Sequence, residues 1–247
     1  MTRTSSPAEA AADWLAEAVE TGNPLAPLPA EAVPATVPEG QRIAALVLER
    51  LGLVPCGLRL APGPEGGPEG GMVPGPVLEG RLLPDGAGIA LAALRHPGVA
   101  PAILGVLAEA LPAEGDDGAL PRFAALHPTL DITAWRLRDP PREAALAAAD
   151  LAGLGLLVVG RRAKGAEPAP CRLGLGPAGS PRRRERRSPE VDLPAALRAA
   201  AQAAREAGGL PAGAVLVAVL GPPMVPQAEM EVSASLAGFG RVRARFG

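Results

Sequence analysis

The C-terminal part of the chain constrains the fold most, because residues 203–246 read as consecutive strands separated by turns. Residues 214–220 form a continuous apolar run of strand length. Residues 230–236 and 241–246 alternate apolar and polar side chains, as strands do when one of their faces is buried. Glycine and proline stand between these runs and mark turns. The pattern predicts a β-rich end of the chain.

Helical patterns lie mainly near the N-terminus. Residues 7–21 predict an amphipathic helix, and residues 39–51 predict a second one that ends at Gly52. An alanine-rich stretch at residues 193–207 predicts another helix. Continuous apolar runs predict strands at residues 53–60 and 151–160.

Two segments are expected to be irregular. Residues 63–75 consist mostly of glycine, proline and glutamate and predict a flexible loop, which is either a lid near a site or a plain linker. Residues 161–189 read as a polar insert that contains an arginine run at 182–187. That run predicts a solvated loop, with an anion or partner site as the alternative.

Composition narrows the class of protein. The 247 residues include no Tyr, three Phe and two Trp, so the core must be built from Ala, Leu and Val. A net charge of −2 provides no general attraction for nucleic acid or an anionic membrane. The longest apolar segment is about half a membrane span, and the first residues carry no hydrophobic signal core. We therefore expect a soluble cytoplasmic protein without nucleic-acid or membrane partners.

The inventory of reactive side chains is short. Lys164 and Asn23 are the only residues of their types, and His96 and His127 are the two histidines. Lys164 lies among arginines in an expected loop, which does not favour Schiff-base chemistry, and no serine has the context of a nucleophile elbow. Any chemistry must therefore come mainly from Asp, Glu, Arg and the two His.

The order of the C-terminal pieces resembles a known family. These pieces are, in order, an apolar strand, Leu-Gly-Pro-Pro-Met-Val-Pro at 220–226, an alternating strand, Gly-Phe-Gly at 238–240 and a final strand ending in Arg-Phe. This order is similar to the C-terminus of the 2-keto-4-pentenoate hydratase and 4-oxalocrotonate decarboxylase family, relatives of fumarylacetoacetate hydrolase. The resemblance implies an α+β fold, a mixed, mostly antiparallel β-roll or sandwich with flanking helices. It implies an N-terminal helical segment and linker at 1–70, a β-rich core at 71–247 and assembly into a homo-oligomer.

The resemblance also implies that a metal site has been lost. Family enzymes bind the carboxylate and enol oxygen of a 2-oxo acid to magnesium or manganese, using two Glu on one strand face and a third from another strand. Here Ala100 and Ala102 match the first two ligands and Asp131 matches the third. Methyl groups cannot bind a hard cation, and a single carboxylate holds magnesium only weakly. We expect no metal and no other cofactor.

Other matched positions keep some charge. Arg59 takes the place of the family's site Lys; it could hold a carboxylate or an enolate, or be an ordinary strand Arg that reaches solvent. Asp150 matches a site Asp, while the neighbouring Asn is replaced by Leu151. Arg136 is also retained, although it could form a local ion pair with Asp139.

Several further family motifs are changed. The family has Thr-Gly at the position of residues 217–218, Gly-Asp at 229–230 and Gly-His-Pro at 190–192. His127 could assist catalysis, or be a structural histidine in a turn before Pro128. His96, before Pro97, is more easily read as structural.

Three hypotheses follow for function. The first is a metal-independent lyase, isomerase or cyclase in specialised metabolism, acting on a small, enolisable, 2-oxo-acid-like anion, with Asp131 or Asp150 as general base and Arg59 or Arg136 holding an anionic oxygen. The second is a non-catalytic homologue that binds a partner enzyme or a small ligand. The third is a conventional hydratase or decarboxylase, which the lost ligands argue against.

Overall fold

A computed structural model describes residues 6–64, 71–115, 118–165, 167–178 and 189–247. The described residues form α-helices and strands, joined by short 3-10 turns. The helices are α1 (Pro7–Thr21), α2 (Val37–Arg50), α3 (Ala144–Ala149) and α4 (Leu193–Glu206).

The larger sheet has seven strands in the order β2-β1-β12-β5-β7-β8-β3. Only its β1–β12 and β3–β8 pairs are parallel. Its strands are β1 (Gly57–Pro62), β2 (Met72–Val77), β3 (Leu82–Pro84), β5 (Gly98–Leu107), β7 (Phe123–Thr133), β8 (Leu154–Val159) and β12 (Val215–Val219).

A second sheet has five strands in the order β10-β9-β13-β14-β4, and β11 pairs with β6 in a small ribbon. The smaller strands are β4 (Ala87–Ile89), β6 (Leu111–Pro112), β9 (Cys171–Pro177), β10 (Glu190–Val191), β11 (Gly209–Leu210), β13 (Glu231–Leu236) and β14 (Gly240–Phe246). The predicted α+β fold, mixed and mostly antiparallel with flanking helices, is confirmed.

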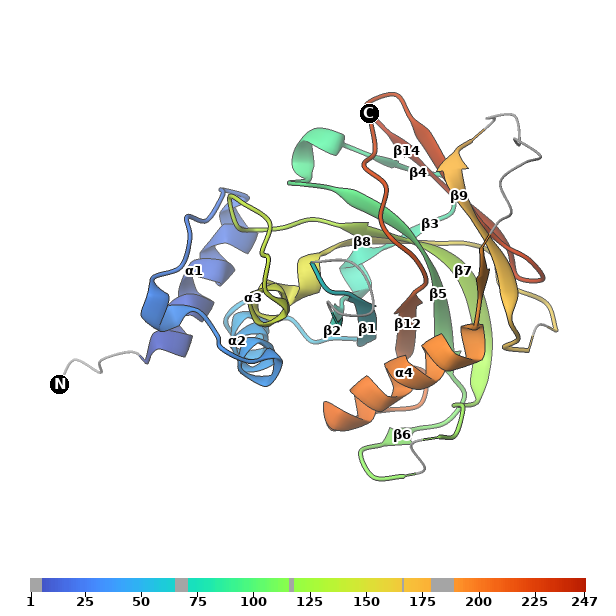
Figure 1. Cartoon of the computed structure of the whole chain (residues 1–247), viewed down its shortest axis with the longest axis horizontal. Coiled ribbons are helices and arrows are strands. Elements are labelled where there is room, and N and C mark those ends of the chain that lie inside the picture. Colours follow the sequence, from blue (N-terminus) through green and yellow to red (C-terminus); the bar gives the residue numbers. More distant parts are fainter. Residues whose placement is uncertain (1–5, 65–70, 116–117, 166, 179–188) are drawn as a thin grey trace.

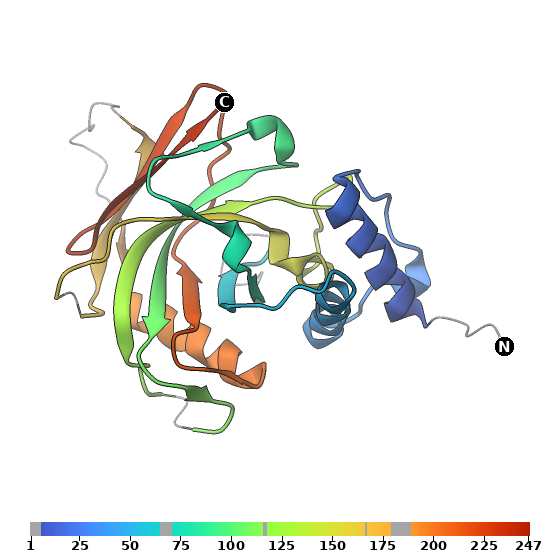
Figure 2. The same cartoon turned by 180° about the vertical axis from the view of Figure 1, so that it is seen from behind.

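The seven-stranded sheet is curled, and its two faces have different neighbours (Figure 1). One face carries Leu58, Ile103 and Leu216, which pack against α4, while Leu130 and Ile132 on the same face pack against the five-stranded sheet. The opposite face lines the inside of the roll, where side chains from β1, β2, β5, β8 and β12 pack on one another. Figure 2 shows the curl from behind.

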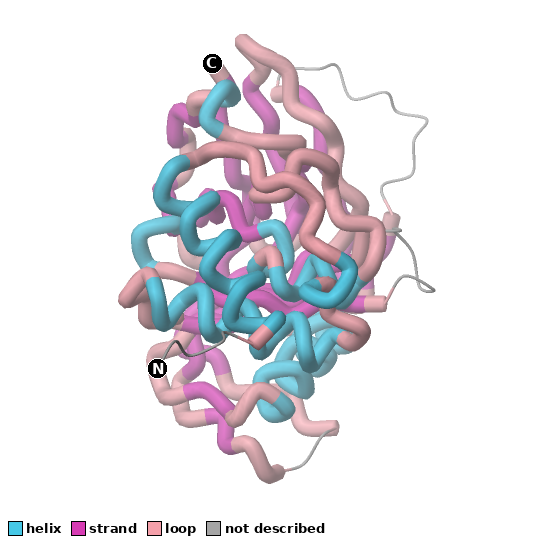
Figure 3. Tube along the Cα trace, turned by 90° about the vertical axis from the view of Figure 1, so that its left-hand side faces the viewer, coloured by secondary structure: helices cyan, strands magenta, loops and turns pink. Residues whose placement is uncertain are grey.

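The helices α1, α2 and α3 gather at one side of the roll (Figure 3). Ser6 and Glu9 form a reciprocal capping box that begins α1. Leu15 of α1 and Val47 of α2 are buried with Leu154, at the start of β8. The helical layer is therefore packed onto the chain that leads into the large sheet.

Several predicted elements are found within one or two residues of their expected ends, including the helix at 7–21, the helix at 193–207 and the last two strands. The predictions for the two segments expected to be irregular were less accurate. The polar insert expected at residues 161–189 contains β9, a central strand of the second sheet, so that prediction is wrong for Cys171–Pro177. The expected loop at 63–75 is wrong from Met72 onward, where β2 begins, and its residues 65–70 lie outside the described residues.

The first seventy residues are not only helix and linker. β1 lies between β2 and β12 in the large sheet and contributes Arg59 to the inside of the roll. A boundary near residue 70 would separate β1 from its antiparallel partner β2, so the helical layer and the sheet do not divide there. In the described part of the chain, no helix is both long and apolar enough to span a membrane. The arginine run at 182–187 lies outside the described residues.

Candidate functional site

A cavity of about 820 Å³ opens at one end of the roll. It forms where β1 and β12 end, where β5 begins and where β7 ends, and these four strand ends meet because β1 and β12 are parallel while β5 and β7 are antiparallel neighbours. Most of its wall is apolar, with seven prolines: Pro62, Pro64, Pro97, Pro140, Pro141, Pro222 and Pro223. Proline has a fixed φ and no backbone N–H, so these residues make the wall stiff and poor in hydrogen-bond donors.

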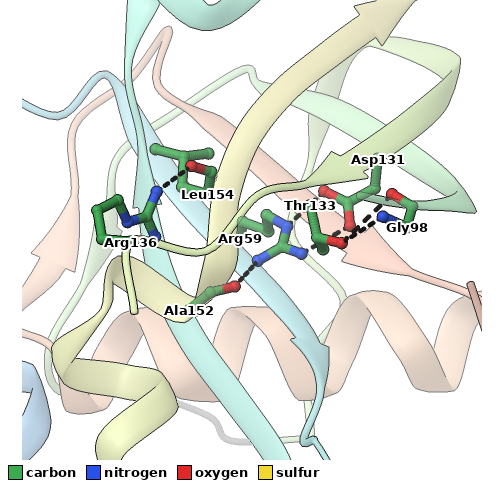
Figure 4. A network of polar contacts seen from close by, with 7 residues as sticks. All are labelled: Arg59, Gly98, Asp131, Thr133, Arg136, Ala152 and Leu154. Carbon is green, nitrogen blue, oxygen red and sulfur yellow. Dashed lines mark hydrogen bonds and ion pairs between the residues drawn. The ribbon is translucent and has the colours of Figure 1, made fainter. Parts of the chain in front are cut away.

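Arg59 and Asp131 form a buried ion pair that lines this cavity (Figure 4). The Arg59 Nε–H donates to Asp131 Oδ1 at 2.5 Å, and its Nη2–H donates to Oδ2 at 2.6 Å. The two residues are only 1% and 2% exposed. Such a fork-to-fork pair fixes the orientation of both groups.

The curl of the sheet makes this pair possible. Arg59 is on β1 and Asp131 is on β7, and two strands lie between them in the sheet. Three strand spacings would separate them by roughly 14 Å in a flat sheet. Because the sheet rolls, the long Arg59 side chain crosses the interior and reaches the carboxylate.

A third bond anchors Arg59 to a left-handed turn. Its Nη1–H donates to the carbonyl oxygen of Ala152 at 2.7 Å. Leu151, Ala152 and Gly153 have φ values of +53°, +52° and +67°, a left-handed conformation that residues other than glycine rarely adopt. The turn leads into β8, and the bond from Arg59 helps to hold it in this conformation.

The positions matched to the family's metal ligands do not suit a divalent cation. Ala100 is the β-ladder partner of Asp131, and Ala102 is the partner of Thr129, so all four side chains share the inner face of the sheet. The other acidic or basic side chain at this place is Arg59, and both oxygens of Asp131 accept hydrogen bonds from it. Within the described ranges, no three His, Cys, Asp or Glu side chains lie close enough together to hold a metal ion.

Arg136 and Asp150 form a second ion pair, apart from the first. Asp150 accepts the backbone N–H of Arg136 at 2.9 Å and a short bond from its Nε–H, while Arg136 Nη1–H donates to the Leu154 carbonyl at 2.6 Å. Burial raises the pKa of the Asp150 carboxyl, and the Arg136 guanidinium opposes that rise. The alternative ion pair of Arg136 with Asp139 is not formed, because Arg136 is committed to Asp150.

This second pair ties the residues after β7 to the turn before β8. Asp150 is not among the residues that line the cavity at the mouth of the roll, and neither is Arg136. The five predicted site residues therefore do not gather at one place. Arg59 and Asp131 meet at the cavity, whereas Arg136 and Asp150 pair with each other outside its lining.

The sequence favoured His127 over His96 as a site residue, but the structure places His96 at the cavity and His127 away from it. His127 is within β7 rather than in a turn, its Nδ1 lies 2.9 Å from the Gly160 carbonyl oxygen, and it does not line the cavity. His96 does line the cavity, and its Nε2 lies 2.7 Å from the carbonyl oxygen of Arg138. Its φ of +47° marks an unusual backbone conformation at the cavity wall.

Sequence reasoning missed other cavity residues. Thr133, Trp135, Met72 and Met224 line the cavity, yet none was singled out. The available signal was weak: Thr133 lies two residues after Asp131, and so on the same strand face, and Met224 follows the Gly-Pro-Pro break after β12. Thr133 Oγ1 is engaged with the backbone of Gly98, accepting its N–H at 3.0 Å.

The sequence matches no protein-family model and no curated protein, but the fold matches solved structures. It superposes on 4-oxalocrotonate decarboxylase from Pseudomonas putida G7, complexed with magnesium and adipate, with a TM-score of 0.77 at 17% identity over 97% of each chain. The same enzyme with calcium and acetate gives 0.76 at 18% identity, covering 100% of this chain and 99% of that one.

More distant matches also carry chemistry on this fold. A 2-hydroxyhepta-2,4-diene-1,7-dioate isomerase from Mycobacterium marinum has a TM-score of 0.54 at 13% identity, over 78% of this chain and 76% of its own. Fumarylpyruvate hydrolase from Pseudomonas aeruginosa, with Mn²⁺ and pyruvate, has 0.51 at 11% identity, over 71% and 78%. The fold predicted from the resemblance is therefore confirmed, and it is a fold that hosts decarboxylase, isomerase and hydrolase activities.

Proposed function

We propose, from a fold shared with 4-oxalocrotonate decarboxylase, that this protein is a metal-independent lyase or isomerase acting on a small enolisable 2-oxo acid at the mouth of the roll. The buried Arg59–Asp131 pair at the cavity carries the proposal. It combines a fixed cation with a carboxylate in a pocket whose size suits a small organic acid.

Arg59 would take over the electrostatic role that a metal has in related enzymes. A guanidinium has five N–H donors, and three of those of Arg59 bind Asp131 and Ala152. Two donors are left for a carboxylate or enolate oxygen of the ligand. Because the guanidinium stays protonated and its position is fixed, it stabilises developing negative charge without rearranging.

Asp131 would move the proton. It accepts a proton from the carbon next to the ketone, and the C–H electron pair becomes the enolate, whose oxygen accepts a hydrogen bond from Arg59. Return of the proton to a different carbon completes an isomerisation, and departure of a β-substituent with its electron pair completes a lyase step. Asp150 and Arg136 are less suited to these roles because they do not line the cavity.

Deuterium exchange tests the proton transfer directly. Purified protein in D₂O with EDTA should exchange the C3 protons of 2-oxobutanoate faster than buffer, as followed by proton NMR. The Asp131→Asn variant should lose at least about 100-fold of this rate, the usual loss when a general base is removed. Asp139→Asn, which changes an exposed carboxyl, is the matched control and should keep it. The proposal is excluded if the wild type shows no exchange. It is also excluded if Asp131→Asn, shown by circular dichroism to be folded, exchanges at the wild-type rate.

A second candidate function is ligand binding without catalysis. It is favoured by one observation: both Asp131 oxygens already accept hydrogen bonds from Arg59, so neither oxygen is free of a partner when a ligand enters. In that case the protein would bind 2-oxo acids or oxalate without accelerating exchange. The predicted homo-oligomer rests on the resemblance and stays a prediction, which sedimentation velocity would test.

A further inference from the structure

A second cavity, of about 610 Å³, lies between the end of α1, the end of β7 and the segment before β5. Three arginines line it, Arg81, Arg95 and Arg136, and no Asp or Glu is among its lining residues. A cavity with this lining has an excess of positive charge at its surface.

Only one of these arginines has its charge balanced. Arg136 pairs with Asp150, whereas Arg81 and Arg95 have no ion pair or side-chain hydrogen bond within the described part of the chain. Both are half-buried rather than extended into solvent. Burial and the nearby charge of Arg136 lower the pKa of Arg81.

We propose that this arginine-lined cavity is a binding site for a small organic anion that carries a carboxylate or phosphate group. Planar guanidinium groups recognise such groups through paired N–H donors, and an anion would offset the repulsion between Arg81 and Arg136. Asn23 adds an amide to the wall, and the volume suits a molecule larger than a single inorganic ion.

The arginine-lined cavity is next to the cavity at the mouth of the roll. His96 and Trp135 line both, so the two cavities share part of a wall. The two cavities differ in chemistry, since the first is mostly apolar around one neutralised pair and the second is cationic. This inference does not depend on the reaction proposed above.

Calorimetric titration in a buffer free of chloride tests the site, with inorganic phosphate and succinate as separate probes. We expect saturable binding of at least one probe, and a loss of at least tenfold in affinity in Arg81→Gln and Arg95→Gln. Arg42→Gln, which removes an exposed arginine of α2, is the matched control and should bind normally. Stronger binding of phosphate or of succinate identifies the anionic group that the site prefers.

A stability measurement accompanies the titration. Without added anion, Arg81→Gln should melt at the same temperature as wild type or higher, because it removes a poorly compensated charge. The preferred probe should raise the melting temperature of wild type but not of the variant. No saturable binding of either probe would overturn the proposal. Binding that both arginine variants retain at the wild-type affinity would also overturn it, since the anion would then bind away from Arg81 and Arg95.

Discussion

Arg59 and Asp131 each depend on the other for their place in the interior. Removing two charges from water costs several kcal/mol per ion, and the pair recovers this through mutual attraction and the bond to Ala152. A single substitution leaves one charge buried without a partner. The pair therefore contributes little to the net stability of the fold, but its two members depend strongly on each other.

A double-mutant cycle measures that coupling. Arg59→Met alone should lose about 3 to 5 kcal/mol of unfolding free energy, because Asp131 remains as a buried, unpaired carboxylate. Combining it with Asp131→Leu should recover most of this loss, since two apolar groups of similar volume then fill the site. Urea unfolding followed by circular dichroism gives the values. A double variant whose loss equals the sum of the losses of Arg59→Met and Asp131→Leu would show that the two residues are not coupled.

Glu229 has a backbone conformation that its residue type disfavours. Its φ is +61°, and its side chain is exposed at the turn before β13. The family that this chain resembles has glycine at the matched position, and glycine adopts this conformation without a steric penalty. A glycine at position 229 would therefore fit the backbone of this chain better than Glu229 does.

Restoring that glycine should stabilise the protein. Glu229→Gly removes a left-handed conformation that costs an L-residue about 1 to 2 kcal/mol, partly offset by the greater freedom of glycine in the unfolded chain. We expect a net gain of about 1 kcal/mol in thermal or urea unfolding. Glu229→Gln, which removes the charge and keeps the side chain, should change little, and an equal gain there would point to the charge instead.

At the scale of elements, α2 and α3 approach one another more closely than side chains normally allow. A Cβ added to Gly40 of α2 would lie 2.1 Å from the carbonyl oxygen of Ala145 and 2.9 Å from the Cβ of Ala148. The backbone of α2 therefore rests directly on α3. This contact orders the segment that leads to Asp150 and to the left-handed turn.

Gly40→Ala should accordingly destabilise the protein, although alanine is the better helix former. Forcing the helices apart costs about 1 to 3 kcal/mol, against a gain in helix propensity of about 1 kcal/mol. The net loss should appear in urea unfolding. Gly80→Ala is the control, because a Cβ there meets nothing within 4 Å, and it should be neutral or slightly stabilising. A stable Gly40→Ala would mean that the two helices separate easily.

The elements that could be predicted are those whose pattern is local. The apolar run at 214–220 and the alternation at 241–246 have the periods of strands, and they form β12 and β14. β9 was missed because its alternation, Cys171-Arg-Leu-Gly-Leu, is short and stands within a polar segment. Its stability comes from pairing with β13, a partner about sixty residues away that no local pattern shows.

For the site residues too, some features could be predicted from the sequence and others could not. Matched spacing singled out Arg59 and Asp131, which meet at the cavity, but it also singled out Arg136 and Asp150, which do not line it. Which charges pair is decided by the curl of the sheet and by the turn at residues 151–153. These depend on contacts across the whole fold, so sequence spacing could find charged positions but not their partners.

At the scale of the whole molecule, the roll resembles that of a decarboxylase solved with magnesium and adipate. The positions that would present carboxylates to a cation carry Ala100 and Ala102, and the remaining Asp131 is neutralised by Arg59. An enolate or carboxylate entering this interior meets a guanidinium. Under the proposed function, the fold is kept while the group that binds the 2-oxo acid is exchanged from a metal to Arg59.

A thermal-shift titration tests that exchange. After treatment with EDTA and its removal, magnesium or manganese at millimolar concentration should leave the melting temperature unchanged, because Asp131 has no free ligand partners nearby in the described residues. Oxalate, an enolate mimic, should raise it without metal, since a ligand that binds only the folded state stabilises it by mass action. Sulfate at equal ionic strength controls for screening, and Arg81→Gln separates binding at the arginine-lined cavity from binding at Arg59. A rise that requires metal and oxalate together would mean that other carboxylates assemble a cation site, and hydratase or decarboxylase chemistry would then be the better hypothesis.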